Sequence, residues 1–306
     1  MKKEIFTNKY SSVLLALLVA VLWGSAFPTV KAGYALFSIA AEDISAKLVY
    51  AGIRFFSAGV IDMIIGVIMY KHFMLPKKNY AKAILTLGII QTFCQYLFFY
   101  IAIGNMAGSK GSVINSMGTF LTVLLAHFFY ANDRLDKKKI LGCALGIAGI
   151  IVINLGGDMG SGFKLAGDGV MLLAALSCAM GNVLTKKIAK GLDSVWLTAY
   201  HLAFGGLMLL IVGLCTGGRI HVVSFKAIVV MAYLASLSAV SFIIWMMLLK
   251  YNPVGKISIF TALVPICGTY LSGIILKENV FTLINLIALV LVAGGIFVIN
   301  YQKSRR

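Results

Sequence analysis

The side chains of this sequence that could do chemistry are few, and they stand inside long apolar runs. Asp62 falls near the middle of the apolar run 46–70. A carboxyl group inside hydrocarbon either holds a proton or finds a partner. Arg54 lies about two helical turns earlier and roughly 80° round the helix, so we expect no direct contact between the two side chains. Asp62 is therefore a candidate for carrying protons, with a hydrogen bond between packed helices as the alternative.

Polar and aromatic residues in other apolar runs could line a cavity for a small amphipathic solute. Gln91 and Gln95 are four residues apart, as are Tyr96 and Tyr100, so each pair would share one face of a helix. For every candidate, packing against another helix or against lipid is the alternative. The candidates for the cavity are Trp23, Ser25, Lys31, Gln91, Gln95, Tyr96, Tyr100, Asn115, Thr119, Asn182, Trp245 and Thr261.

Two prolines are candidates for breaking helices inside the membrane. Pro28 and Pro265 each remove a backbone donor within an apolar run, and carbonyl groups freed in this way can line a cavity. Lys31 follows Pro28 in the same run. A buried ammonium group there would need a carboxylate, a carbonyl or an anionic solute, whereas an ammonium group that extends to the headgroups would not.

Metal, nucleotide and cofactor sites are not indicated. The five cysteines and four histidines are scattered, and neither C-x-x-C nor H-E-x-x-H occurs, so we expect no metal. The motif GxxxxGK[ST] is absent, which argues against direct ATP use, and we expect no cofactor.

The composition is that of an all-α integral membrane protein. Hydrophobic residues make up 60% of the chain and charged residues 12%, whereas soluble domains carry roughly 25% charged residues. Ten apolar runs, each of about 20 residues, are long enough to cross a bilayer. The predicted helices are 11–33, 46–70, 80–103, 109–130, 138–155, 168–189, 194–215, 225–249, 256–276 and 280–301.

The net charge of +17 is explained by the loops between these runs. The basic residues form no stripe with interleaved aromatics, so nucleic acid is not an expected partner. Nineteen of the 27 Lys and Arg residues fall on the side of the two termini if the ten helices alternate in direction. The positive-inside rule then places both termini in the cytoplasm and the chain in the cytoplasmic (inner or plasma) membrane.

The chain contains an internal repeat. Residues 104–154 align with residues 250–300 without a gap at a shift of 146, and both segments close on similar strings, G-I-I-V-I-N and G-I-F-V-I-N. Five helices per copy is an odd number, so the second copy enters the membrane from the opposite face. We therefore predict two inverted five-helix repeats, 11–155 and 168–301. Inverted repeats enclose a solute site at their interface and expose it by rocking, which indicates a secondary transporter with a small-molecule substrate.

Three segments carry a family resemblance. They are L-W-G-S-A-F-P-T-V-K at 22–31, A-A-L-S-C-A-M-G-N-V-L-T-K-K at 174–187, and Pro265 followed by Glu278 and by A-G-G-I at 293–296. The chain thereby resembles the drug/metabolite transporter superfamily, specifically its ten-helix EamA-type members. The first half departs from the pattern, because Thr119 stands where the proline would be and Asn132-Asp133 replaces Gly-Glu. The resemblance implies export of amino acids or related metabolites by alternating access.

Other functions stay open beside this one. A proton-coupled exporter of drugs or toxicants would need a membrane acid in its cavity, which makes Asp62 the discriminating residue. A membrane-embedded enzyme or a sensor is a more distant alternative. Gly142 and Gly146 form G-x-x-x-G, which predicts helix packing within the chain or in a homodimer. The sequence does not identify the substrate, the direction of transport, the coupling ion or the oligomeric state.

Overall fold

The computed structural model describes residues 3–76, 78–130, 134–155, 162–188, 193–252 and 257–300, and within these ranges the regular structure is entirely helical. Ten helical segments are long and apolar enough to cross a membrane, as predicted. A short helix, α1 (Lys3–Thr7), precedes them. We number the spanning segments one to ten: α2 (Lys9–Leu36), α3 (Ile44–Tyr70), α4–η1–α5 (Lys78–Leu87, Gly88–Cys94, Gln95–Gly104), α6–α7 (Gly108–Asn115, Met117–Phe129), α8 (Lys137–Leu155), η3–α9 (Leu165–Gly169, Val170–Ile188), α10 (Ser194–Cys215), α11 (Phe225–Tyr251), η4–α13 (Ile259–Ala262, Leu263–Leu276) and α14 (Leu283–Asn300).

Most boundaries lie within three residues of the prediction, and the differences reflect local capping. The first segment runs over residues 9–36 instead of 11–33 because the Asn8 side chain accepts hydrogen bonds from the backbone N–H groups of Tyr10 and Ser11. A polar residue that caps the first turn lets a helix begin before its apolar run does.

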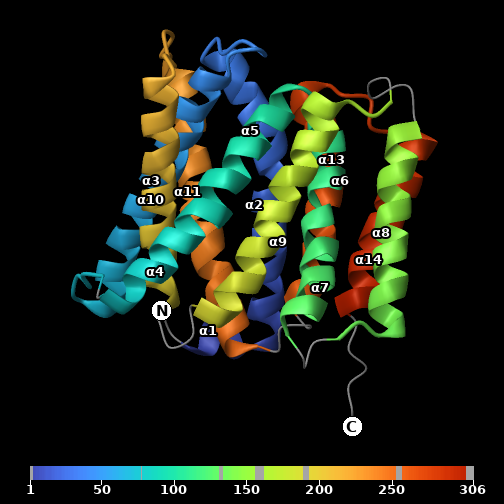
Figure 1. Ribbon diagram of the computed structural model, residues 1–306, viewed down its shortest axis with the longest axis horizontal. Coiled ribbons are helices and arrows are strands. Elements are labelled where there is room, and N and C mark those ends of the chain that lie inside the picture. Colours follow the sequence, from blue (N-terminus) through green and yellow to red (C-terminus); the bar gives the residue numbers. More distant parts are fainter. Residues whose placement is uncertain are drawn as a thin grey trace.

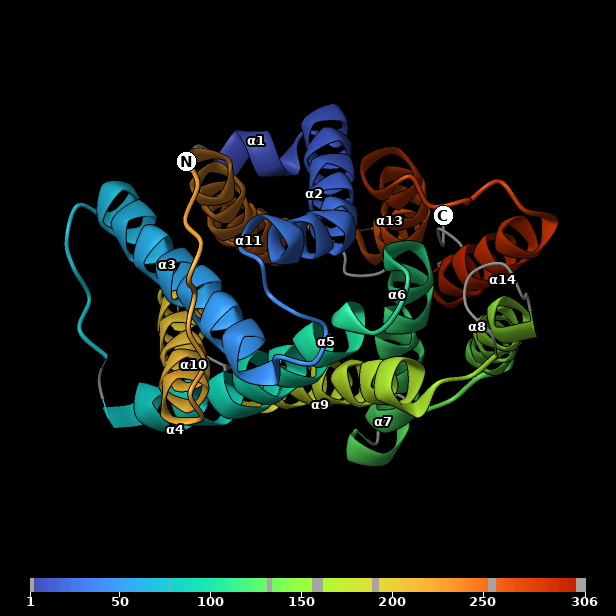
Figure 2. The same cartoon turned by 90° about the horizontal axis from the view of Figure 1, so that it is seen from above.

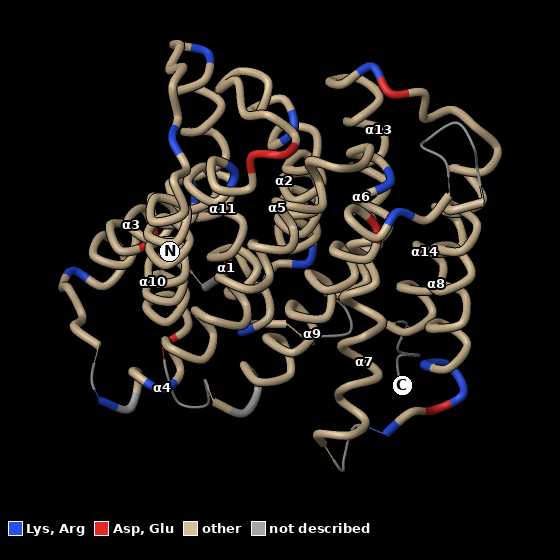
Figure 3. The backbone as a smooth tube through the Cα atoms, turned by 45° about the horizontal axis from the view of Figure 1, so that its top comes forward, with Lys and Arg blue, Asp and Glu red and all other residues tan. Residues whose placement is uncertain are grey.

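The segments cross the bundle in alternating directions, so α1 and the end of α14 lie at the same end, which we call the terminal end (Figure 1). The opposite end is called the far end. Charged residues gather near the helix ends and in the loops, and the backbone between them is mostly uncharged (Figure 3). This distribution fits a bundle whose middle faces hydrocarbon.

The helices pair in a pattern with internal symmetry. Segment two packs along segment seven (α3 with α10), and segment five packs along segment ten (α8 with α14). These two pairs lie at opposite edges of the bundle (Figure 2). Between them, segment one packs on segments eight and nine, while segment six packs on segments three and four. Exchanging each segment for the one five places along reproduces the same set of pairs, as an internal two-fold relation would require.

Small residues allow the two edge pairs to approach closely. A Cβ on Gly206 of α10 would lie 2.3 Å from the backbone nitrogen of Phe56 in α3. In the other pair, a Cβ on Gly142 would lie 2.4 Å from Ile299, and one on Gly295 would lie 2.5 Å from the Gly142 carbonyl. Gly146 faces α7 instead, where a Cβ would lie 2.2 Å from the Phe120 ring. The two glycines of G-x-x-x-G therefore pack inside the chain, which is the helix-packing use of this motif.

The two prolines predicted to break helices differ in outcome. Pro28 lies inside the continuous helix α2, so no break occurs there. Pro265 is the third residue of α13, and the 3-10 turn Ile259–Ala262 ends three residues before it, where its missing N–H leaves carbonyl groups without a helical donor. Segment four also breaks, at Ser116.

Candidate functional site

The breaks of segments four and nine occupy corresponding positions of the sequence repeat. The shift of 146 places Asn115, the last residue of α6, opposite Thr261 inside η4. The two segments also pack on each other, since the Ser112 Oγ lies 3.3 Å from the Pro265 carbonyl and 3.3 Å from the Thr269 Oγ1. Interrupted helices in matching positions of two halves are the strongest structural indication of a transporter binding site.

Three of the predicted polar residues near these breaks have side chains free to bind a solute. Gln95, Asn115 and Thr119 are half-buried, and none makes a side-chain hydrogen bond with any described part of the chain. Amide and hydroxyl groups that are out of bulk water need partners, and a solute or water can supply them.

The other predicted polar residues are engaged within the protein. The Ser25 Oγ lies 2.6 Å from the Tyr233 hydroxyl and donates to the Leu22 carbonyl. The Thr261 hydroxyl donates to the Ser258 carbonyl of its own turn at 2.7 Å. These two hydroxyls are therefore satisfied in this conformation.

Asn182 bonds to segments three and four. Its side-chain oxygen accepts a hydrogen bond from the Gln91 amide at 3.1 Å, and its own amide lies 3.3 Å from the Thr122 hydroxyl. Asn182 thus reaches segment four one turn beyond Thr119. It joins the polar side chains of three segments into one network.

Aromatic side chains connect segment one to segments eight and three. The Trp23 ring lies 5.1 Å from that of Trp245 and 5.8 Å from that of Phe242, between ring centroids. Phe27, one turn further, contacts Phe99 edge-on at 5.4 Å. These contacts provide an apolar surface that runs from segment eight over segment one to segment three, and segment one itself packs on α6 and η4.

The predicted pairing of side chains in segment three is changed by a π-helical stretch. Residues Gly88–Cys94 form a π-helix, whose i→i+5 hydrogen bonds widen the turn, so residues four apart no longer align. Gln91 therefore meets Asn182, whereas Gln95 is free. Both tyrosines of this segment turn toward α3, since the Tyr96 ring stacks on Phe55 at 3.8 Å and the Tyr100 hydroxyl accepts a hydrogen bond from Arg54.

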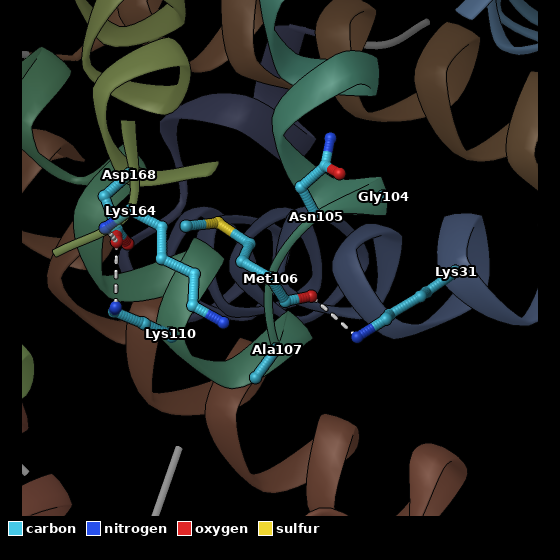
Figure 4. Close-up of a pocket in the computed structure, with 8 residues that line it drawn as sticks. All are labelled: Lys31, Gly104, Asn105, Met106, Ala107, Lys110, Lys164 and Asp168. Atoms are coloured by element: carbon cyan, nitrogen blue, oxygen red, sulfur yellow. Dashed lines mark hydrogen bonds and ion pairs between the residues drawn. The ribbon is translucent and has the colours of Figure 1, made fainter. Parts of the chain in front are cut away.

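A basic pocket of about 320 Å³ opens at the far end of the bundle (Figure 4). The Lys31 amino group donates to the Met106 carbonyl at 2.6 Å and lies 3.7 Å from the Glu278 carboxylate. Lys31 therefore reaches a cavity as well as partners in the loops that follow segments three and nine. The lining residues are Lys31, Gly104, Asn105, Met106, Ala107, Lys110, Lys164 and Asp168.

A buried ion pair forms the floor of this pocket. The Lys110 amino group lies 2.9 Å from the Asp168 carboxylate and donates to the Gly162 carbonyl at 3.0 Å. Both side chains are nearly inaccessible. The Lys164 side chain points into the pocket, and its ammonium group has no partner among the described residues (Figure 4). The pocket therefore presents one unpaired positive charge to any solute at its mouth.

Glu278, at the far end, caps the first turn of α6 in the other half of the chain. Its carboxylate accepts hydrogen bonds from the backbone N–H groups of Gly108 and Ser109, at 2.8 and 3.0 Å, and from the Ser109 hydroxyl at 2.5 Å. A carboxylate at a helix N-terminus is stabilised by the free N–H groups and the helix dipole. Segments one, four and nine are thus held together at this end.

A family model describes nearly the whole chain. Residues 10–155 and 165–301 each match the EamA-like transporter family. The chain belongs to this family. It is an EamA-type member of the drug/metabolite transporter superfamily, and it is accordingly a multi-pass membrane transporter.

Bacterial relatives match this EamA-type transporter over nearly its whole length. An uncharacterized transporter, YvbV, of Bacillus subtilis is 27% identical over 307 residues, which cover 96% of this chain and 92% of the relative. A protein of Escherichia coli named "Probable amino-acid metabolite efflux pump" is 26% identical, with 95% and 96% covered. A solved crystal structure has the same fold, with a TM-score of 0.64 at 17% identity, covering 95% of this chain and 97% of that one.

Asp62 lies apart from the broken segments. It is fully buried in α3, and neither carboxylate oxygen has a hydrogen-bond partner. It is spaced three and four residues from Gly59 and Gly66, whose faces contact Ala203 and Trp196 of α10. Asp62 therefore belongs to the edge pair of segments two and seven, and the described residues pair no cation with it.

Sequence reasoning missed several polar residues of the EamA-type transporter that the fold brings together. Lys110 and Asp168 are far apart in sequence, and so are Glu278 and the start of α6. Spacing along the sequence relates Arg54 only to Asp62, whereas in the fold it contacts Tyr100 of segment three and Ser238 of segment eight. The available signal was the charge itself, because an ionisable residue inside a predicted span is a functional candidate by default.

We expect Asp168→Asn to destabilise the protein by about 3–5 kcal/mol, because the change leaves the Lys110 ammonium group buried without a counter-ion. The double change Lys110→Met, Asp168→Asn should recover most of that loss. Thermal unfolding of the purified protein in detergent measures both. Equal losses in the single and the double variant would mean that the ion pair does not account for the effect.

Proposed function

We propose that this EamA-type transporter exports a small organic metabolite, of the amino-acid class, across the cytoplasmic membrane by alternating access. The moving parts are two inverted five-helix repeats, residues 11–155 and 168–301. The observation that carries the proposal is the pair of breaks, one at Ser116 and one at Ile259–Ala262, at positions related by the shift of 146.

The breaks support transport because irregular backbone is costly at membrane depth. It is tolerated only where it is buried in protein or lines a cavity. Two such places in matching positions, packed on each other, favour a solute site between the halves. The symmetrical helix pairing supports rocking of one half against the other, since each contact across the interface has a counterpart.

The side chains near the breaks suit a solute with polar and apolar ends. Gln95, Asn115 and Thr119 offer amide and hydroxyl groups without partners in the described chain. Trp23 and Trp245 offer an aromatic surface on the adjoining segments. An amino acid has this character, and the name of the Escherichia coli relative supports the same substrate class.

Reconstituted transport tests the proposal. Proteoliposomes loaded with a radiolabelled mixture of the twenty amino acids should release one or more of them faster than protein-free liposomes. Asn115→Leu should slow this release up to about tenfold, because one hydrogen bond to the solute is lost. The matched control is Asn300→Leu, since Asn300 bonds only to its own helix at Ile296. Release that never exceeds the protein-free rate would refute the substrate class.

The proposed orientation, with both termini in the cytoplasm, predicts the labelling of one cysteine. Cys215 is exposed at the end of α10, so segment seven would deliver it to the outer face. A membrane-impermeant maleimide should label intact cells, and Cys215→Ser should remove most of the label. Labelling that requires permeabilised cells would place the termini outside.

A second candidate function is proton-coupled export of drugs or toxicants, which one observation favours. Asp62 is fully buried without a partner, so a charge on it would be uncompensated in this conformation. Such a carboxyl group suits a proton carrier. The position of Asp62 argues against this role, because the residue lies in the α3–α10 pair, away from the broken segments.

Asp62→Asn separates coupling from transport. If Asp62 carries the coupling proton, the variant keeps solute exchange at equal pH but loses the acceleration of efflux by an acidic exterior. The control is Asp136→Asn, an exposed acid before α8. Proteoliposomes with an imposed pH gradient give both rates, and an unchanged acceleration in Asp62→Asn would rule out this role.

A further inference from the structure

Arg54 is a buried cation without a counter-ion. Its side chain in α3 is 3% exposed. The Nε donates to the Ser238 hydroxyl at 3.0 Å, and Nη1 donates to the Tyr100 hydroxyl at 3.0 Å. Among the described residues the ion pairs are Lys31 with Glu278 and Lys110 with Asp168, so no carboxylate neutralises the guanidinium.

The surroundings of Arg54 compensate its charge only in part. Its guanidinium carbon lies 4.8 Å from the centroid of the Phe55 ring, and its hydrogen-bond partners are neutral. A charged side chain inside a membrane protein costs several kcal/mol, roughly 2.5–3.5 by insertion scales, unless a partner offsets it. Lys47 of the same helix is also buried without an ion pair among the described residues, and it bonds to the Ala41 carbonyl of the preceding loop. Arg54 differs because its partners Tyr100 and Ser238 lie on two other segments, one in each half, and a charge at this interface points to an anion.

The donors that remain are those that bind a carboxylate. A guanidinium carries five N–H donors, and among the described residues only Nε and Nη1 of Arg54 donate hydrogen bonds. Two parallel donors on one edge match the two oxygens of a carboxylate. Nε forms such an edge with Nη2, and Ser238 occupies half of it here.

The bond to Ser238 crosses between the two halves. Arg54 and Tyr100 belong to residues 11–155, while Ser238 lies in α11 of the second half. Rocking of the halves would separate Arg54 from Ser238 while Tyr100 stays on Nη1. This movement frees the Nε–Nη2 edge in step with the opening of the interface.

We propose that Arg54 binds the carboxylate of the transported solute through its Nε and Nη2 groups, with Tyr100 holding the guanidinium in place. The proposal rests on the function proposed above and narrows its substrate class to solutes with a free carboxylate. The basic pocket at the far end, with the unpaired Lys164, favours the passage of the same class of solute.

The test compares each amino acid with its carboxamide. Proteoliposomes are loaded with equal amounts of the twenty amino acids and their amides, and efflux is resolved by mass spectrometry. The wild type should prefer acids over amides by about tenfold to a hundredfold, as expected for charge-assisted hydrogen bonds. Arg54→Gln should lose this preference, and Arg54→Lys should keep a part of it.

The matched control is Lys47→Gln. Lys47 is a buried cation two turns earlier in α3, and it bonds to the Ala41 carbonyl. It should leave the preference for acids unchanged even if it lowers the amount of folded protein. Equal wild-type rates for acids and amides would overturn the role of Arg54 and leave the transporter assignment standing. Retained preference in Arg54→Gln would overturn it as well, whereas absence of any efflux would remove the proposed function itself.

Discussion

The structure depends on one constraint, which is that every backbone N–H and C=O group inside a lipid bilayer needs a partner from the protein. Regular helices meet this need within one segment, and the ten spans consist largely of them. The exceptions therefore carry information. Segment four stops being helical at Ser116, and segment nine begins in a 3-10 turn. At the break in segment four, the Ser116 N–H still donates to the Val113 carbonyl and the Thr119 N–H to the Ser116 carbonyl. The matching positions of the two breaks, rather than a missing backbone partner, support the proposed site between the halves.

Buried charged side chains also need partners inside the bilayer, and they differ in whether they have one. At the far end two charged groups have partners from other segments: Lys110 pairs with Asp168, and Glu278 caps α6. The buried Lys47 bonds there to the Ala41 carbonyl. Deeper in the bundle, Arg54 has only neutral partners and Asp62 has none. The paired charges hold segments together at the far end. Arg54 and Asp62 are the groups for which a ligand and a proton are proposed above.

The sequence predicts the helices well because hydropathy acts within one segment. All ten spans and the repeat register of 146 could be read from apolar runs and matching strings. The π-helix at Gly88–Cys94 could not, because it depends on the approach of segment seven. Gly205 there has so little room that a Cβ would lie 2.5 Å from the Gly88 carbonyl. Likewise, a helix pattern cannot show that Arg54 and Ser238 meet, because their contact joins two helices far apart in sequence.

The two ends of the bundle are not equivalent, and the repeat explains why this matters. A perfect inverted repeat would give the outward-open and inward-open states equal energies, since each is the image of the other. Glu278 breaks that symmetry, because the shift of 146 places Asn132 at the corresponding position of the first half. A carboxylate that caps a helix is worth more than a neutral amide in the same place, by up to about 2 kcal/mol where it is partly buried. Under the proposed alternating access, this cap would add stability only to the state in which segments four and nine lie together at the far end, because Glu278 follows segment nine and the capped N–H groups begin segment four.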